Sequence, residues 1–501
     1  MNRRHFLMKS SAFTMAAAAP SFLRMPGLIN DAAAATLEQA NYVLPTRMPQ
    51  VINLFLYGGA SELAGNLTNI EQIDAASQNR YPSELLAAVN GDEGQVTQNG
   101  FWRNAGGAAM EDMLASGDMS VYRTINRLKD NTRAHRQSIF SSQKGSLNID
   151  GSPGMGSTIA AVLEANRSAL DGSTQLGGKT LEELVLPFVS LEGTSVAFSA
   201  QGDINLPLRL RGLSLDENFE NPYSRSNDQH AAELNAIVRQ VENQTLRTRY
   251  AKIHGGFESR DRMEALIGNL QTAIDNPLPQ VPNSSVDGSV DIDVNPDTGY
   301  LRYPDNNRFS NRLKAAVTLA IANPDTLFIS LGNGIGSWDD HDSSLNEYAP
   351  RMQQLMEALR VATKHIRYAD TRFGGNRDTG NIIINVHGDF GRNVNLNNSL
   401  GWDHGNNQNL YTFGGHSIRG RAALGKIVGK TEIFGSAANN RLFTRPTDDS
   451  YQAEPMTIAA STYKYFGVRN PTVLTRDAEY NPSGDNALDE TVAGENIVTT
   501  G

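Results

Sequence analysis

Val51-Ile52-Asn53-Leu54-Phe55-Leu56 is a compact apolar run that leads into Gly58-Gly59. A short and nearly continuous apolar run is typical of a strand that is buried on both faces, and the glycine pair allows a tight turn directly after it. Further apolar runs of strand length lie at residues 119–123, 184–191, 326–331, 381–386 and 410–413.

Helical patterns alternate with these strands in the last third of the chain. The spacing of the apolar residues predicts helices over residues 311–322 and 345–368. Strands and helices in alternation predict an α/β fold with a largely parallel, doubly wound sheet flanked by helices. We expect residues 36–501 to form a single large domain with a helical and loop insertion around residues 200–300. Ligands of such sheets bind in the crevice beyond the carboxyl ends of the strands.

Residues 1–35 have the features of a twin-arginine signal peptide. Arg3-Arg4 and Lys9 precede a weakly apolar, alanine-rich stretch, and Ala32–Ala35 offers a small-residue cleavage site. Paired arginines before such a stretch select the Tat route. We therefore expect the Tat translocase as an export partner and a periplasmic or secreted mature protein. The alternatives are an amphipathic N-terminal helix or a membrane anchor, but the apolar stretch is too short to span a bilayer and contains Pro20.

The composition restricts the partners and the kinds of metal site. The chain has no cysteine and a formal net charge of −10, and removal of the signal peptide, which carries +3, leaves −13. An acidic surface disfavours nucleic acids and anionic lipids as partners. Without cysteine, a metal must be held by His, Asp, Glu or backbone oxygen. No segment of the mature chain is long and apolar enough to be transmembrane.

Three polar clusters lie at the ends of predicted strands. Gly336–Asp342 and His387–Arg392 each follow a strand, and Gly401–Asn407 precedes one. Imidazole and carboxylate together suit Zn²⁺, Mn²⁺ or Fe²⁺. One such cluster alone is better explained as a solvated turn, but three at one edge of a sheet indicate a site. His365 is expected on the surface of its helix, and His416 fits either interpretation.

These motifs occur in the order seen in a large bacterial family, domain of unknown function 1501, which the chain resembles. The shared features are the twin-arginine start, the first strand ending in Gly-Gly, Trp-Asp-x-His at residues 338–341, acidic-Phe-Gly-Arg at 389–392 and Asp-His-Gly at 403–405. The family resembles the alkaline phosphatase and sulfatase superfamily. In that superfamily, Asp and His hold two metal ions beyond the strand ends, and a Ser or Thr at a helix N-terminus attacks phosphorus or sulfur.

The resemblance implies metal ligands in this chain. Asp339 and His341 resemble one ligand pair, and Asp389 stands where another acidic ligand is expected. His404, with Asp403 beside it, resembles the late histidine of the family. The implied cofactor is a divalent metal, Zn²⁺ or Mn²⁺.

The resemblance also implies catalytic residues. The segment from Arg133 to His135 resembles a family segment that usually reads Arg-Ser-His-Phe. Thr132 is the nearest hydroxyl for a nucleophile and can cap a helix. Arg392 or Arg133 would assist by stabilising the developing negative charge.

Three positions depart from the family pattern. Ser61 stands where the family has Asp, although Glu62 can reach in from the next position; Asp389 replaces Glu; and Ala134 replaces the serine beside His135. These changes favour one metal, or none, over a full binuclear centre.

The acidic string Asp287–Asp297 spaces oxygen groups two residues apart, as Ca²⁺ sites do. It lacks the Gly and distal Glu of an EF-hand, and Pro296 interrupts it, so a solvated acidic loop is the preferred interpretation.

Two functions remain open at this point. The first is an exported, metal-dependent hydrolase or transferase that acts on phosphate or sulfate esters, small or belonging to the cell envelope. The second is a non-catalytic, sulfatase-like scaffold that binds a glycan, an envelope component or an exported protein. The retained Asp and His residues favour the first, and the changes at Ser61 and Ala134 favour the second.

The export hypothesis makes a direct prediction. Replacing Arg3 and Arg4 by Lys should leave the precursor in the cytoplasm, because the Tat route recognises the arginine pair. Fractionation followed by immunoblotting measures this, and unchanged periplasmic accumulation would reject the Tat assignment.

Overall fold

The fold is described from a computed structural model of the chain. The Tat segment, Thr132 and most of the predicted insertion lie outside the residues that the structure describes. Those residues are 36–67, 96–130, 133–200, 206–219, 236–237, 240, 264–275, 278–281, 291–304, 308–332, 337–342, 345–436, 441–478 and 481–495.

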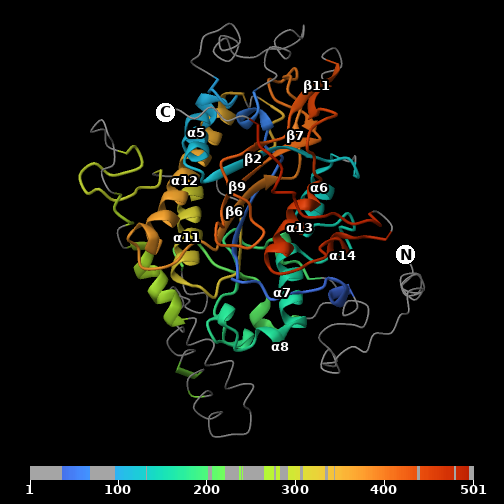
Figure 1. Ribbon diagram of the computed structural model, residues 1–501. Helices are drawn as coiled ribbons and strands as arrows, with labels where there is room; N and C mark the ends of the chain where they lie inside the picture. Colours follow the sequence, from blue (N-terminus) through green and yellow to red (C-terminus); the bar gives the residue numbers. More distant parts are fainter. Residues whose placement is uncertain are drawn as a thin grey trace.

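An eight-stranded sheet forms the centre of the protein, as the apolar runs predict (Figure 1). Its strand order is β10-β2-β9-β6-β1-β5-β3-β4, so the first strand of the chain lies in the middle. The strands are β1 (Gln50–Leu56), β2 (Met119–Asn126), β3 (Phe188–Ser190), β4 (Leu213–Ser214), β5 (Phe328–Leu331), β6 (Ile382–Gly388), β9 (Asn407–Gly414) and β10 (Ile427–Val428).

The sheet is parallel except for β9, which pairs antiparallel with both β6 and β2. The connection from β6 to β9 contains only the short hairpin of β7 (Gly391–Arg392) and β8 (His404–Gly405) and no helix. A chain that returns directly, without a crossover to the other end of the sheet, runs antiparallel. The start of β9 therefore lies at the sheet edge where the parallel strands end, and Asp403-His404 comes to the same edge as Gly58-Gly59, Asp339 and Asp389.

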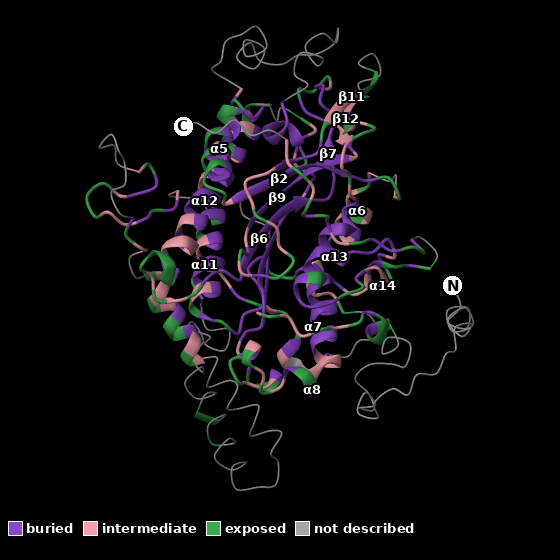
Figure 2. Ribbon diagram, in the orientation of Figure 1, coloured by how far each residue is buried: buried purple, intermediate pink, exposed green. Residues whose placement is uncertain are grey.

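Helices cover both faces of the sheet and leave it almost completely buried (Figure 2). Ile52 and Leu54 pack on one face, together with apolar side chains of α5, α11 and α12. Val51 points to the other face, where α7 and α13 pack. The helices are α5 (Gly107–Ala115), α6 (His135–Lys144), α7 (Met155–Ala165), α8 (Arg167–Leu170), α11 (Arg308–Ala322), α12 (Leu345–Ala369), α13 (Met456–Tyr465) and α14 (Thr472–Thr475).

The observed elements agree with the predicted α/β architecture, and within the described residues no helix is both long and apolar enough to cross a membrane. The expectation for His365 is wrong. Its side chain is buried beside Tyr303, with 3.3 Å between His365 Nδ1 and the Tyr303 hydroxyl. Burial lowers the pKa of His365 to about 3, so this imidazole is a neutral part of the core. His416 is exposed.

The described half of the acidic string is tied to α12 and is not a free, solvated loop. Both carboxylate oxygens of Asp293 accept hydrogen bonds from Arg360, at 2.8 and 2.9 Å. Lys364 donates to both Asp291 and Asp293 at 2.7 Å. These carboxylates are neutralised by two cations, which explains the acidic spacing without Ca²⁺.

The turn after β1 permits the close approach of two other loops. Gly58 has a φ of +109°, and a Cβ atom there would collide with the backbone of Trp338 at 2.7 Å and of Asp339. Gly59 has a φ of +76°, and a Cβ atom would lie 2.5 Å from the ring of Phe390. Both conditions require glycine.

A comparison of two glycines tests this close approach. Gly117 also has a positive φ, +70°, but open space around the missing Cβ. Gly117→Ala should therefore cost about 1–2 kcal/mol for the left-handed backbone alone. Gly58→Ala should cost clearly more because the loop carrying Asp339 must also move. Urea unfolding of both variants measures the difference, and equal losses would contradict the close packing.

Candidate metal centre

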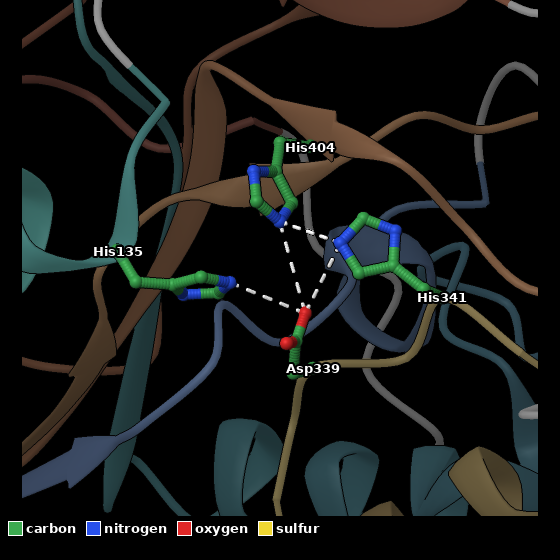
Figure 3. A group of neighbouring side chains, drawn as sticks. All are labelled: His135, Asp339, His341 and His404. Carbon is green, nitrogen blue, oxygen red and sulfur yellow. Dashed lines mark hydrogen bonds and ion pairs between the residues drawn. The ribbon is translucent and has the colours of Figure 1, made fainter.

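Four side chains from three loops meet at the carboxyl edge of the sheet (Figure 3). Asp339 and His341 follow β5, His404 lies just before β9, and His135 is the first residue of α6, which follows β2. One ligand atom from each of these four residues lies within 4.8 Å of all the others. We call these four residues the metal cluster.

The separations within the metal cluster suit a single small cation. The Asp339 Oδ1 atom lies 3.2 Å from Nε2 of His135, 3.2 Å from Nε2 of His341 and 3.7 Å from Nε2 of His404. The Nε2 atoms of His341 and His404 are 2.8 Å apart. Tetrahedral bonds of about 2.0–2.1 Å place ligand atoms about 3.3 Å apart, and the observed separations lie on both sides of this value.

Each imidazole of the cluster is held from behind through its Nδ1 atom. His135 Nδ1 lies 2.9 Å from Asp389, and His341 Nδ1 lies 3.1 Å from Asp403. His404 Nδ1 donates to the carbonyl oxygen of Arg133 at 2.6 Å. These acceptors place the proton of each neutral ring on Nδ1, so that each Nε2 lone pair faces the centre of the cluster. Metal-ligating histidines show this arrangement.

The inward lone pairs repel one another unless something positive lies between them. His404 is neutral at pH 7, because burial, with the positive charge of Arg392, lowers its pKa to about 4. Its Nε2 lone pair then faces the neighbouring Nε2 of His341. The buried Nε2 of His135 has no hydrogen-bond partner among the described groups. A divalent cation would satisfy all three nitrogens.

Arg392 positions the carboxylate of the cluster. Its guanidinium is completely buried and donates to Asp339 Oδ1 at 2.8 Å. Further donations go to Gly59 O and Trp402 O at 2.8 Å, to Trp338 O at 3.0 Å, and to Gly58 O. Burial opposes ionisation of Asp339, but the hydrogen bond and charge of Arg392 outweigh it and keep the pKa of Asp339 below its usual value.

The predicted catalytic role of Arg392 therefore needs correction. A side chain with no exposed surface, whose donors are already engaged, cannot contact a substrate. It acts by holding Asp339 anionic and in place.

The structure separates the five predicted metal ligands into two groups. Asp339, His341 and His404 belong to the metal cluster. Asp389 and Asp403 lie behind imidazoles instead, and Asp389, which is completely buried, also accepts from the backbone N–H of Gly58 at 3.0 Å. Their carboxylates orient imidazoles of the cluster and are not members of it.

The predicted catalytic residues are also distributed differently. His135 is a member of the metal cluster, and hydrogen bonding to Asp389, the main cause, raises its pKa. Arg133 contacts His404 through its backbone carbonyl and through its guanidinium, which donates to His404 O at 3.1 Å. Thr132 lies outside the described residues.

Glu62 does not take the place of the missing aspartate at position 61. Its carboxylate is buried and accepts from the backbone N–H of Arg392 at 3.1 Å and from the Thr444 hydroxyl at 2.6 Å. Burial raises the pKa of Glu62 to about 7. The described residues contain one group that can hold a metal ion, the cluster above.

The cluster is open to solvent on one side. The side chains of Asp339 and His341 are 41% and 39% exposed, whereas that of His404 is 21% exposed. A ligand can therefore approach from the side of Asp339 and His341.

The fold and the site define an α/β protein with a three-histidine, one-carboxylate cluster at the carboxyl edge of a mostly parallel sheet. The chain belongs to the family described as "Protein of unknown function (DUF1501)", whose model matches residues 48–448. All four cluster residues lie within that match. A comparison with curated proteins gives no match.

Metal content provides a direct test of the cluster. Wild-type protein should bind about one equivalent of metal, and His135→Ala or His404→Ala should lose it because a ligand is removed. Asp389→Asn should weaken binding about 10–100-fold, since it removes only the group that orients His135. Elemental analysis and competition with a chromogenic chelator measure both quantities.

The exposed His416 supplies the matched control, because His416→Ala removes an imidazole outside the cluster. Equal metal loss in this variant, or undiminished binding in His404→Ala, would contradict the site.

Proposed function

We propose that this protein is an exported, metal-dependent hydrolase or transferase that acts on phosphate or sulfate esters. The observation that carries the proposal is the convergence of three inward-facing Nε2 atoms and one carboxylate at a solvent-accessible edge of the sheet. Three imidazoles and one carboxylate are a donor set for Zn²⁺ or Mn²⁺, and we propose one of these as the cofactor.

The side chains present fit such an ion chemically. Bound at the cluster, a divalent metal would act as a Lewis acid on an ester oxygen and offset its negative charge. Asp339 stays anionic through Arg392, and the three imidazoles direct their Nε2 atoms towards the centre of the cluster. The buried carboxylate of Asp389 and the half-exposed one of Asp403 keep the rings from rotating.

The attacking group is, in this proposal, a water molecule or an acceptor hydroxyl from solvent. Among the described residues, no Ser or Thr hydroxyl hydrogen-bonds to a side chain of the metal cluster, and Ala134 stands beside His135. Thr132 precedes this segment and remains a proposed alternative nucleophile.

Kinship to the alkaline phosphatase and sulfatase superfamily is part of the proposal. It is supported by a mostly parallel sheet with Asp and His groups at the carboxyl ends of its strands. The twin-arginine start supports a periplasmic or secreted location.

Metal removal tests the enzymatic function. Dialysis against a chelator should abolish hydrolysis of p-nitrophenyl phosphate or p-nitrophenyl sulfate, and added Zn²⁺ or Mn²⁺ should restore it. His404→Ala should lose turnover and metal together, whereas His416→Ala should keep both.

Thr132→Ala distinguishes the two nucleophiles, because it should retain turnover if solvent supplies the attacking group. A metal-loaded wild-type protein without turnover on either ester class would reject the enzyme and favour a non-catalytic scaffold that binds a glycan, an envelope component or a partner protein.

A further inference from the structure

A small hairpin packs beside the metal cluster and presents a face of its own to solvent. It is formed by β11 (Thr431–Ser436) and β12 (Arg441–Pro446). Along β12 the side chains alternate: Leu442 and Thr444 are buried against the site, and Arg441, Phe443 and Arg445 point the other way. The Thr444 hydroxyl donates to Glu62, and Val394 N donates to Leu442 O at 2.9 Å, so the hairpin is fixed to the loops of the site.

The outward face combines aromatic rings with guanidinium groups. Phe434 and Phe443 lie opposite each other on the two strands, with ring centroids 6.4 Å apart, and Phe434 is 49% exposed. The guanidinium of Arg133 lies 5.3 Å from the Phe443 centroid. Arg441 is two residues from Phe443 on the same face of β12, so its side chain lies near Phe443 and Arg133.

Two positive charges on this face lack acidic partners among the described residues. Arg445 is ion-paired with Glu432 at 2.6 Å, but no described carboxylate pairs with Arg133 or Arg441. Arg133 and Arg441 lie close enough for their like charges to repel each other. Within the described part of the chain, Arg133 and Arg441 are thus two neighbouring arginines without a carboxylate partner.

The guanidinium of Arg133 lies beside the metal cluster but is not directed at its centre. Its guanidinium binds the backbone oxygen of His404, while Nε2 of His404 points to the centre of the cluster. The whole imidazole side chain thus separates the two positions. A ligand that reaches both must extend beyond its reacting group.

We infer that Arg133, Arg441 and the Phe434–Phe443 face form a subsite for an anionic sugar next to the metal cluster. Guanidinium groups bind sulfate, phosphate or carboxylate through charge-assisted hydrogen bonds. The exposed ring of Phe434 packs against the apolar C–H face of a sugar ring. This inference rests on the proposed function in one respect, namely that the sugar is the alcohol part of the ester. The substrate class is then a sugar ester with a second anionic group.

Binding to metal-free protein tests the subsite separately from turnover. Dextran sulfate and dextran phosphate oligosaccharides are the charged probes, and uncharged dextran of equal length is the reference, each titrated by calorimetry. Wild-type protein should bind a charged probe more tightly than the reference. Arg441→Ala and Arg133→Ala should each weaken that binding about tenfold, as expected for one charged hydrogen bond.

Lys430→Ala is the matched control. It removes an exposed positive charge at the base of the same hairpin, where Lys430 pairs with Asp449 at 3.2 Å, so it changes the net charge equally without touching the subsite. Its affinity for the charged probes should equal that of the wild type. Metal content should be unchanged in Arg441→Ala.

If Lys430→Ala and Arg441→Ala weaken the binding of the charged probes equally, the binding depends only on the net charge of the protein, and the subsite is overturned. Equal affinity of wild-type protein for charged and uncharged dextran would also overturn it. If the charged probes bind as expected while metal-loaded protein hydrolyses no ester, the subsite stands and the proposed hydrolase fails.

Discussion

The buried guanidinium of Arg392 is the group on which the geometry of the site depends. It donates to Gly59 O after β1, to Trp338 O and Asp339 after β5, and to Trp402 O between β6 and β9. Taking such a cation out of water costs several kcal/mol, which only a complete set of acceptors offsets. Three loops are therefore fixed relative to one another by one side chain. This arrangement also keeps Asp339 anionic and fixes its position.

Much of the fold follows from the local sequence. The run from Val51 to Leu56 gives the central strand because an apolar strand without alternation must be covered on both faces. The direction of β9 cannot be predicted from its own residues, because their pattern fits a buried strand that runs either way. Only the missing helix between β6 and β9 indicates a direct return, and this return brings His404 to the edge where Asp339 lies.

The sequence allowed a prediction of where the candidate site lies, but not of what each of its residues does. Motifs after strands identified Asp339 and His341, because the carboxyl ends of parallel strands share an edge, whereas His404 was identified through the family motif Asp-His-Gly. Whether a carboxylate faces the ion or the back of an imidazole depends on side-chain directions that spacing does not encode. Asp389 was therefore predicted as a ligand, although it lies behind His135. The position of His135 as the first residue of a helix after β2 was the available indication of its inward direction.

The carboxylates that a second ion would need are already engaged. Asp389 accepts from Gly58 and faces Nδ1 of His135, and Glu62 accepts from Arg392 and Thr444. Ser61 caps the turn at Leu63 with its hydroxyl. A site with one divalent ion, and with Asp339 among its ligands, offers little net positive charge to an anionic ester. Arg133, which donates to His404 O, and the neighbouring Arg441 add positive charge next to the site, and in the proposed function they attract an anionic sugar ester towards it.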